Sequence, residues 1–151
     1  MITFYKPNSK NSGCGCSFNI GNDQKSNSRF FINMIRQYSW DDKTKNGSFS
    51  ANRDNPEHTL TAMFNEVECG EMLHAIWYRQ TWKGYHTTDK GNTQIQLGYD
   101  KEKGFSLSMK KSSQEKNLFI SLSTGEIQVL RVILERAIVS AYNSSNAKAK
   151  T

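Results

Sequence analysis

The sequence is short of cysteine and of long apolar runs, and each shortage excludes a class of protein. The three cysteines, two of them in a Cys-x-Cys spacing, are an odd number with no accompanying histidine cluster. This argues against a disulfide framework and against a zinc site. No apolar run is long enough to span a membrane, and the N-terminus lacks the apolar core of a signal peptide. We therefore expect reduced cysteines, no membrane association, no metal or other cofactor, and an intracellular, cytoplasmic location, with organellar and nuclear locations left open.

Arrangements of residues that support catalysis are also missing. Cys69 lies among the acids of segment 66–71, where negative charge disfavours a thiolate. Those acids suit the first turn of a helix, whose dipole favours negative charge. The Gly13-Cys14-Gly15 stretch lacks the Lys-Ser/Thr pair of a phosphate-binding loop. The sequence therefore predicts a protein that is not an enzyme.

Acidic residues are scarce relative to basic ones. Lysine and arginine outnumber aspartate and glutamate by 20 to 14, which gives a net charge of +6. In the first 40 residues the single acid, Asp23, stands against Lys6, Lys10, Lys25, Arg29 and Arg36. A basic balance favours polyanionic partners, because neutralising phosphates releases counterions.

One sequence pattern occurs twice. Residues 59–68 and 117–126 each alternate three apolar side chains along a strand and then reach a helix N-cap, followed three residues later by Glu. The capping pairs are Asn65 with Glu68 and Ser123 with Glu126. Upstream, residues 37–41 resemble 96–100, and residues 47–52 resemble 104–108 with one residue inserted. An internal repeat predicts one structural unit used twice.

Each copy is predicted to fold as four strands followed by a helix, giving an α+β protein. The first copy, about 16–79, has strands near 16–21, 29–40, 48–53 and 58–64 and a helix near 66–79. The second copy, about 82–142, has strands near 82–88, 93–99, 105–111 and 117–122 and a helix near 124–142. We expect one domain over 1–151, with a basic N-terminal arm, a polar C-terminal tail, and two antiparallel sheets whose apolar faces the helices cover.

Glycines mark the predicted hairpin turns. The segments 46–47, 89–92 and 101–104 each place a Gly where a tight reversal requires a positive φ. The two prolines, Pro7 and Pro56, lie outside the predicted strands.

The two faces of the predicted strands differ in kind. Along 105–110, for example, Phe, Leu and Met alternate with Ser, Ser and Lys. Once the apolar side is covered, the other side is a surface of Gln, Ser, Asn and Lys with occasional aromatics and few acids. An ordinary solvated sheet face is one interpretation. Rings on which bases stack, cations for phosphates and amides for base edges are also what unstacked nucleotides require.

We predict that this surface binds single-stranded nucleic acid. The side chains expected to hold phosphates are Lys43, Lys45, Lys83, Lys110 and Lys111. Those expected to stack on bases are Phe31, Trp82, Tyr85 and Phe119. Those expected to form hydrogen bonds are Asn33, Gln94, Gln96, Ser106 and Ser108.

The duplicated four-strand-plus-helix unit, with its basic and polar sheet faces, resembles the Whirly superfamily, which includes the positive-cofactor-four type of transcriptional coactivator. The resemblance covers about residues 16–142. It implies single-strand binding with little sequence specificity, of the kind used in transcription, replication or recombination, and a homo-oligomer formed through helices.

Two alternatives stay open. Single-stranded DNA is favoured, but the partner could be RNA, because contacts to a 2′-hydroxyl leave no readable signature in a sequence. The apolar helix that ends in residues 137–142 could instead mark a protein-interaction module, such as an accessory subunit of a polymerase complex.

Overall fold

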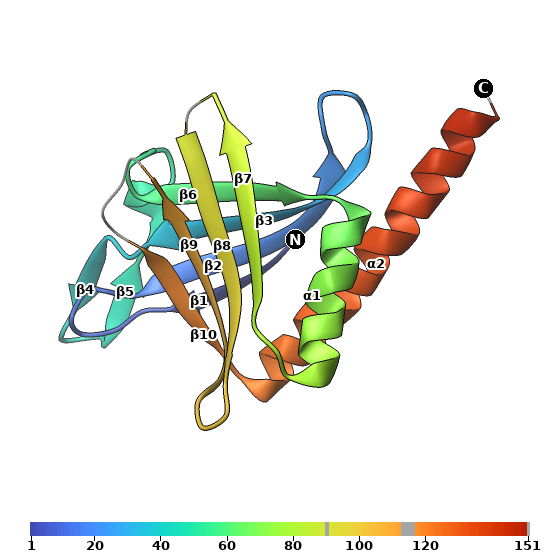
Figure 1. Ribbon diagram of the computed structural model, residues 1–151. Coiled ribbons are helices and arrows are strands. Elements are labelled where there is room, and N and C mark those ends of the chain that lie inside the picture. The colour runs from blue at the N-terminus through green and yellow to red at the C-terminus, as the bar shows by residue number, and fades with distance from the viewer. Residues whose placement is uncertain (90, 113–116, 151) are drawn as a thin grey trace.

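Two antiparallel sheets cross one another in the computed structural model, and two helices lie at one end of the crossed pair (Figure 1). The structure describes residues 1–89, 91–112 and 117–150. The N-terminal sheet has the order β1 (Ile2–Lys6), β2 (Cys14–Asn22), β3 (Ser28–Arg36) and β6 (Thr59–Phe64). The C-terminal sheet has the order β7 (Trp82–Thr88), β8 (Gly91–Asp100), β9 (Gly104–Lys111) and β10 (Leu118–Leu122). The predicted α+β class with antiparallel sheets is confirmed.

Each sheet leads directly into a helix. Helix α1 (Glu66–Tyr78) follows β6, and α2 (Thr124–Ala149) follows β10. Both begin with the predicted capping boxes, in which the Asn65 and Ser123 side chains accept from the backbone N–H three residues on, and the Glu side chains accept in return. The helices pack against each other, α2 also against β2 and β3, and α1 against β7.

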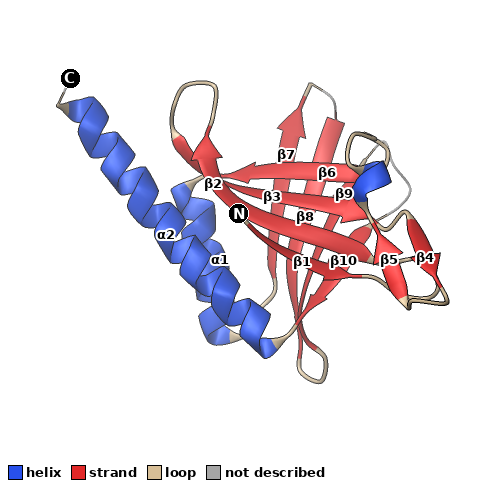
Figure 2. Cartoon of the chain, turned by 180° about the vertical axis from the view of Figure 1, so that it is seen from behind, coloured by secondary structure: helices blue, strands red, loops and turns tan. Residues whose placement is uncertain are grey.

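The apolar faces of the two sheets cover each other. Alternate residues of the strands point inward into one continuous core, with Phe30, Ile32 and Met34 of β3 on one side and Ile95 and Leu97 of β8 on the other. Seen from behind, the N-terminal sheet lies across the strands of the C-terminal sheet (Figure 2). The helices, which were expected to cover the apolar faces, therefore cover only part of them. Crossed sheets bury most of each other, and the helices close only one end.

The predicted strand correspondence between the two halves is wrong in the segment before β6. Strands β4 (Ser39–Asp41) and β5 (Asn46–Ser48) form a separate two-stranded sheet, followed by a short 3-10 helix at Ser50–Asn52. The predicted strand over 29–40 breaks at Gln37, whose buried side-chain oxygen accepts from the N–H groups of Asn8 and Gly13. Residues 37–41 and 47–52 are thus an insertion and do not correspond to 96–100 and 104–108.

Glycine has two different uses in the turns. Gly91 and Gly104 adopt φ of 116° and 80°, as predicted. In the predicted turn at 89–92, Lys90 lies outside the described residues. At the β4–β5 turn the positive φ, 56°, falls on Lys45 and not on Gly47. Gly47 is required for a different reason: a Cβ there would lie 2.5 Å from Cβ of Pro7.

Both ends of the chain are more ordered than predicted. The expected N-terminal arm contains the edge strand β1, and the Phe4 ring lies 5.7 Å from that of Phe18. The expected polar tail continues α2 to Ala149. Near its end, Nζ of Lys148 donates to the Lys25 carbonyl and to Oδ1 of Asn27, so the β2–β3 turn supports residues of modest helix propensity.

We predict that Phe64→Ala lowers the free energy of unfolding by about 3–5 kcal/mol, because the Phe64 ring is only 1% exposed and packs between the two sheets. The matched control is Phe119→Ala, whose ring is 56% exposed; we expect a loss below about 1 kcal/mol. Urea denaturation followed by circular dichroism measures both. Equal losses would contradict the assignment of inward and outward faces.

Candidate nucleic-acid interface

The outward face of the C-terminal sheet is polar and spans all four strands. The strand register aligns Lys83, Gln96, Ser108 and Phe119 in one row across the sheet. The next row aligns Tyr85, Gln94 and Lys110. A third row holds Gly98, Ser106 and Ser121. We call the nine side chains of this surface the polar face: Lys83, Tyr85, Gln94, Gln96, Ser106, Ser108, Lys110, Phe119 and Ser121.

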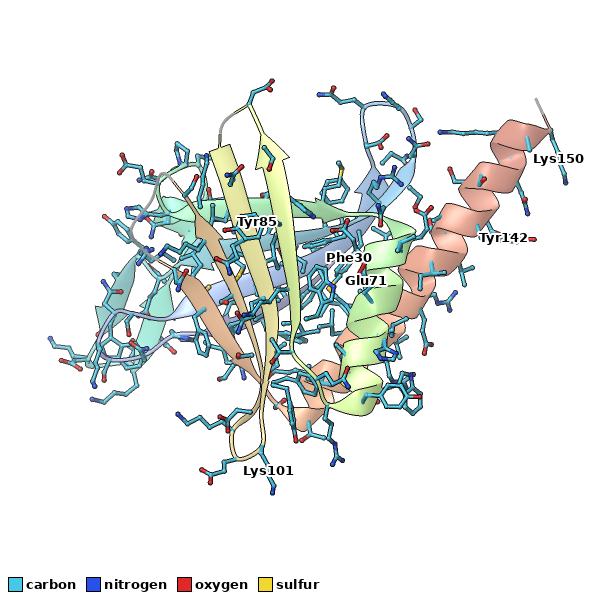
Figure 3. The ribbon with its side chains drawn as sticks, in the orientation of Figure 1. Phe30, Glu71, Tyr85, Lys101, Tyr142 and Lys150 are labelled. Atoms are coloured by element: carbon cyan, nitrogen blue, oxygen red, sulfur yellow. The ribbon has the colours of Figure 1, made fainter. Side chains whose placement is uncertain are left out.

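Two aromatic rings project from the polar face into solvent. Tyr85 on the edge strand β7 is 68% exposed, and Phe119 on the opposite edge strand β10 is 56% exposed. Figure 3 shows Tyr85 over the strands of the C-terminal sheet, away from α2, which carries Tyr142 and is followed by Lys150. Between the two rings lie the amides and hydroxyls of β8 and β9, so a planar ligand could contact a ring at either edge and hydrogen-bond between them.

The charge of the polar face is positive and unneutralised. Among the described residues, neither Lys83 nor Lys110 forms an ion pair, and no described outward side chain between the turns of this sheet is acidic. Asp100 lies at the end of β8, where the backbone N–H groups of Lys103 and Glu102 hold the pKa of its carboxyl below the ordinary value. An anion among the rows of Lys83 and Lys110 would therefore meet two lysines and none of the described carboxylates.

The structure separates the predicted site residues into groups. Eight of them lie together on the polar face: Lys83, Tyr85, Gln94, Gln96, Ser106, Ser108, Lys110 and Phe119. Phe31 and Asn33 lie on the outward face of the other sheet, beside Met63 and Thr61 of β6. Lys111 pairs with Thr93 and, by strand alternation, points to the opposite side of the sheet from Lys110.

Trp82 and the two insertion lysines do not belong to the polar face. The Trp82 ring is only 9% exposed and packs edge-on against Phe64 at 5.9 Å, so the prediction that it stacks on bases is wrong. The physical reason is strand alternation: Lys83 and Tyr85 point outward, so Trp82 must point inward. Lys43 and Lys45 lie in the β4–β5 turn, outside both large sheets, where Nζ of Lys45 is 3.8 Å from Asp42.

A cleft at the junction of the two sheets was missed from the sequence. It has a volume of about 510 Å³ and lies where the edge strands β6 and β7 meet, and we call it the junction cleft. Met63 and Thr61 line it from the N-terminal sheet, and Tyr85 and Thr87 line it from β7 of the C-terminal sheet. The alternation of residues 59–64 already placed Thr61 and Met63 outward, but nothing in the sequence showed that β6 would lie beside β7.

Glu68 also lines the junction cleft, and both of its carboxylate oxygens already have hydrogen-bond partners. Oε2 of Glu68 lies 2.7 Å from Nε2 of His86, while Oε1 accepts the N–H of Asn65 in the capping box. Arg29, which also lines the cleft, is held by Asp23 at 3.3 Å and Glu66 at 3.5 Å. Because these charged groups pair with one another, the groups available to a ligand in the cleft are mainly hydroxyls, the Met63 thioether and the Tyr85 ring.

The three thiols are free and buried. Burial raises the pKa of Cys14 to about 11 and that of Cys16 well above its ordinary value. Burial, together with the charges of Glu68 and Glu66, raises the pKa of Cys69 to about 12. A thiol with so high a pKa is almost entirely protonated near neutral pH and is a poor nucleophile.

Within the described residues, no group of three or more His, Cys, Asp or Glu side chains is arranged to hold a metal ion. No helix of the described chain combines the length and the apolar character needed to cross a membrane. No protein-family model matches the chain, and no curated protein is significantly similar to it.

We predict that, at pH 8, a thiolate-specific reagent labels all three cysteines of the unfolded chain. Over the same time it labels none of the three in the folded protein. The reason is the combined effect of burial and raised pKa. Absorbance of the released chromophore, with and without guanidinium, measures the number of reacting thiols. Prompt labelling of Cys69 in the folded protein would contradict this prediction. It would indicate that Cys69 and the acids around it form a catalytic site.

Proposed function

We propose that the protein binds single-stranded nucleic acid on the polar face, with single-stranded DNA favoured and with little sequence specificity. The observation that carries the proposal is the row of Lys83, Gln96, Ser108 and Phe119, which crosses all four strands without an acid. A sheet surface with a ring at each edge suits an extended strand whose bases are unstacked. A duplex keeps its bases stacked and would offer only phosphates to this surface.

The mechanism divides three tasks among the polar-face side chains. Lys83 and Lys110 bind phosphates, and Tyr85 and Phe119 stack on bases. The amides and hydroxyls between them hydrogen-bond to sugar, phosphate or base edges. Stacking contributes about 1–3 kcal/mol per base and tolerates any base, because every base has a π-face. Low sequence specificity follows from this reliance on rings and phosphates.

A Whirly-like duplication remains part of the proposal. Its support is the shared element order, since a four-stranded meander and a capping box precede a helix in both halves. The insertion of β4, β5 and the 3-10 helix is then specific to the first half. In such an arrangement the polar face of the second half has its counterpart on the outward face of the N-terminal sheet.

Self-association through helices is the second part of the proposal. Helix α2 exposes three apolar side chains in one stripe: Val132, Val139 and Tyr142. They recur at spacings of seven and three residues, which places them on one side of the helix. The same stripe is what favours the alternative function, a protein-interaction module, in which another protein covers it.

We predict that Tyr85→Ala weakens binding of a short oligo-dT by about 1–3 kcal/mol, because one base loses its stacking partner. The matched control is Tyr78→Ala, since Tyr78 on α1 is 66% exposed against 68% for Tyr85 and lies off the polar face. Fluorescence anisotropy with labelled oligo-dT, oligo-rU and a duplex measures the affinities. Equal affinities of the two folded variants would remove Tyr85 from the site, and the ratio of dT to rU affinity distinguishes DNA from RNA.

We predict that binding is steeply salt-dependent and that the dependence runs through the polar-face lysines. Lys83→Ala and Lys110→Ala should each reduce the slope of log affinity against log salt by about 0.7, the value for one phosphate contact on a single strand. Lys150→Ala, at the far end of α2, is the control and should leave the slope unchanged (Figure 3). A salt-independent affinity would favour an apolar contact by the α2 stripe over phosphate binding.

A further inference from the structure

The segment between β5 and β6 packs against the outward face of the N-terminal sheet, where Phe49 and Arg53 help to line a groove. Phe49, just before the 3-10 helix, is buried, and its ring centroid lies 4.9 Å from that of Tyr5 on β1. Asn52 anchors the 3-10 helix, because its buried side chain donates to the Arg36 carbonyl at the end of β3. The insertion groove so formed has a volume of about 450 Å³, within the range of small-ligand sites.

The floor of the insertion groove is a polar row across the N-terminal sheet. The register aligns Thr3, Ser17, Asn33 and Thr61 on neighbouring strands. The Thr61 hydroxyl donates to Oδ1 of Asn33 at 2.7 Å, and no described residue accepts from the Asn33 amide nitrogen. The floor therefore presents a hydrogen-bond donor and several hydroxyls to whatever occupies the groove.

The walls of the insertion groove suit a nucleotide. Tyr5, Phe49 and Ile35 supply apolar and aromatic surface, and no acid is among the residues that line the groove. Gly15 allows the Tyr5 and Ile35 side chains to lie close together, since a Cβ at this position would be 2.9 Å from both the Tyr5 ring and the Ile35 side chain. At the rim, Arg53 is exposed and forms no ion pair with a described residue, which leaves its guanidinium for a phosphate.

The insertion groove is connected to the polar face by shared residues. Tyr85 belongs to the polar face and also lines the junction cleft. Thr61 lines the junction cleft and also the insertion groove. Phe31 and Met63, neighbours on β3 and β6, lie beside this connection. A path without a described unpaired acid thus runs from the polar face, over the junction of β7 and β6, to the groove.

We propose that the insertion groove is a second nucleotide-binding site, at the end of a track that one nucleic-acid strand follows from the polar face through the junction cleft. This inference rests on the proposed function and adds a site to it. In the groove, a base packs against the Tyr5 ring, which is 51% exposed, and hydrogen-bonds to Asn33, while Arg53 binds its phosphate. The protein therefore distinguishes strands by length, since only a strand that spans the junction reaches the groove.

The test compares two oligo-dT strands, about 5 and about 15 nucleotides long, within the range of lengths that single-strand-binding folds occupy. Tyr5→Ala and Arg53→Gln should weaken binding of the long strand by about 5- to 100-fold and leave the short strand unaffected. The control is Tyr38→Ala, since Tyr38 is exposed at the start of the same insertion but does not line the groove. Arg53→Gln changes an exposed side chain, so it stays informative if Tyr5→Ala unfolds the protein.

The affinities for the two strands distinguish the possible outcomes. Loss confined to the long strand supports the track. Unchanged affinity for both strands in Arg53→Gln and in a folded Tyr5→Ala overturns it and leaves the polar-face proposal intact. Equal loss for both strands overturns it as well, because the groove would then be the primary site. If the unmodified protein binds neither strand at low salt, the proposed function fails and the track fails with it.

Discussion

The structure depends on one run of aromatic contacts that joins the two sheets. Ring centroids of Phe4, Phe18, Phe30, Phe64 and Trp82 follow one another at 5.7, 6.0, 6.0 and 5.9 Å. The run begins on the edge strand β1, crosses β2, β3 and β6, and ends on β7 of the other sheet. Because rings of this size bury a large area, they fix which face of each strand is inward. Every outward residue of both sheets takes its position from that choice.

Strand alternation explains how much could be predicted from the sequence. It placed Ile32 inward and Asn33 outward, and it placed eight of the predicted site residues on one surface. The capping boxes at Asn65 and Ser123 were equally readable, since both partners lie within four residues. Trp82 was misassigned because its residue type suited stacking on bases; its position next to outward Lys83 and Tyr85 was the better guide.

What could not be predicted depends on contacts between distant residues. The predicted strand over 29–40 fails because the Gln37 amide is satisfied by Asn8 and Gly13, more than twenty residues away. The same holds for Gly47, which permits a close approach to Pro7 and has an ordinary φ. The junction cleft and the insertion groove arise only once β6 lies beside β7 and the insertion folds back. No local pattern specifies either event.

A surface binds an anion only if its cations are not already paired with carboxylates. Three cations near α1 and α2 are engaged in ion pairs: Arg29 with Asp23 and Glu66, Lys6 with Glu126 at 2.6 Å, and Arg131 with Glu135 at 2.8 Å. Arg131 also lies over the Trp77 ring. The polar face and the groove rim carry cations without such partners. A cation already paired must lose its carboxylate before it gains a phosphate, whereas Lys83, Lys110 and Arg53 gain one without that cost. The net charge of +6 is therefore less informative than the positions of individual cations, of which Lys83 and Lys110 lie on the polar face and Arg53 lines the insertion groove.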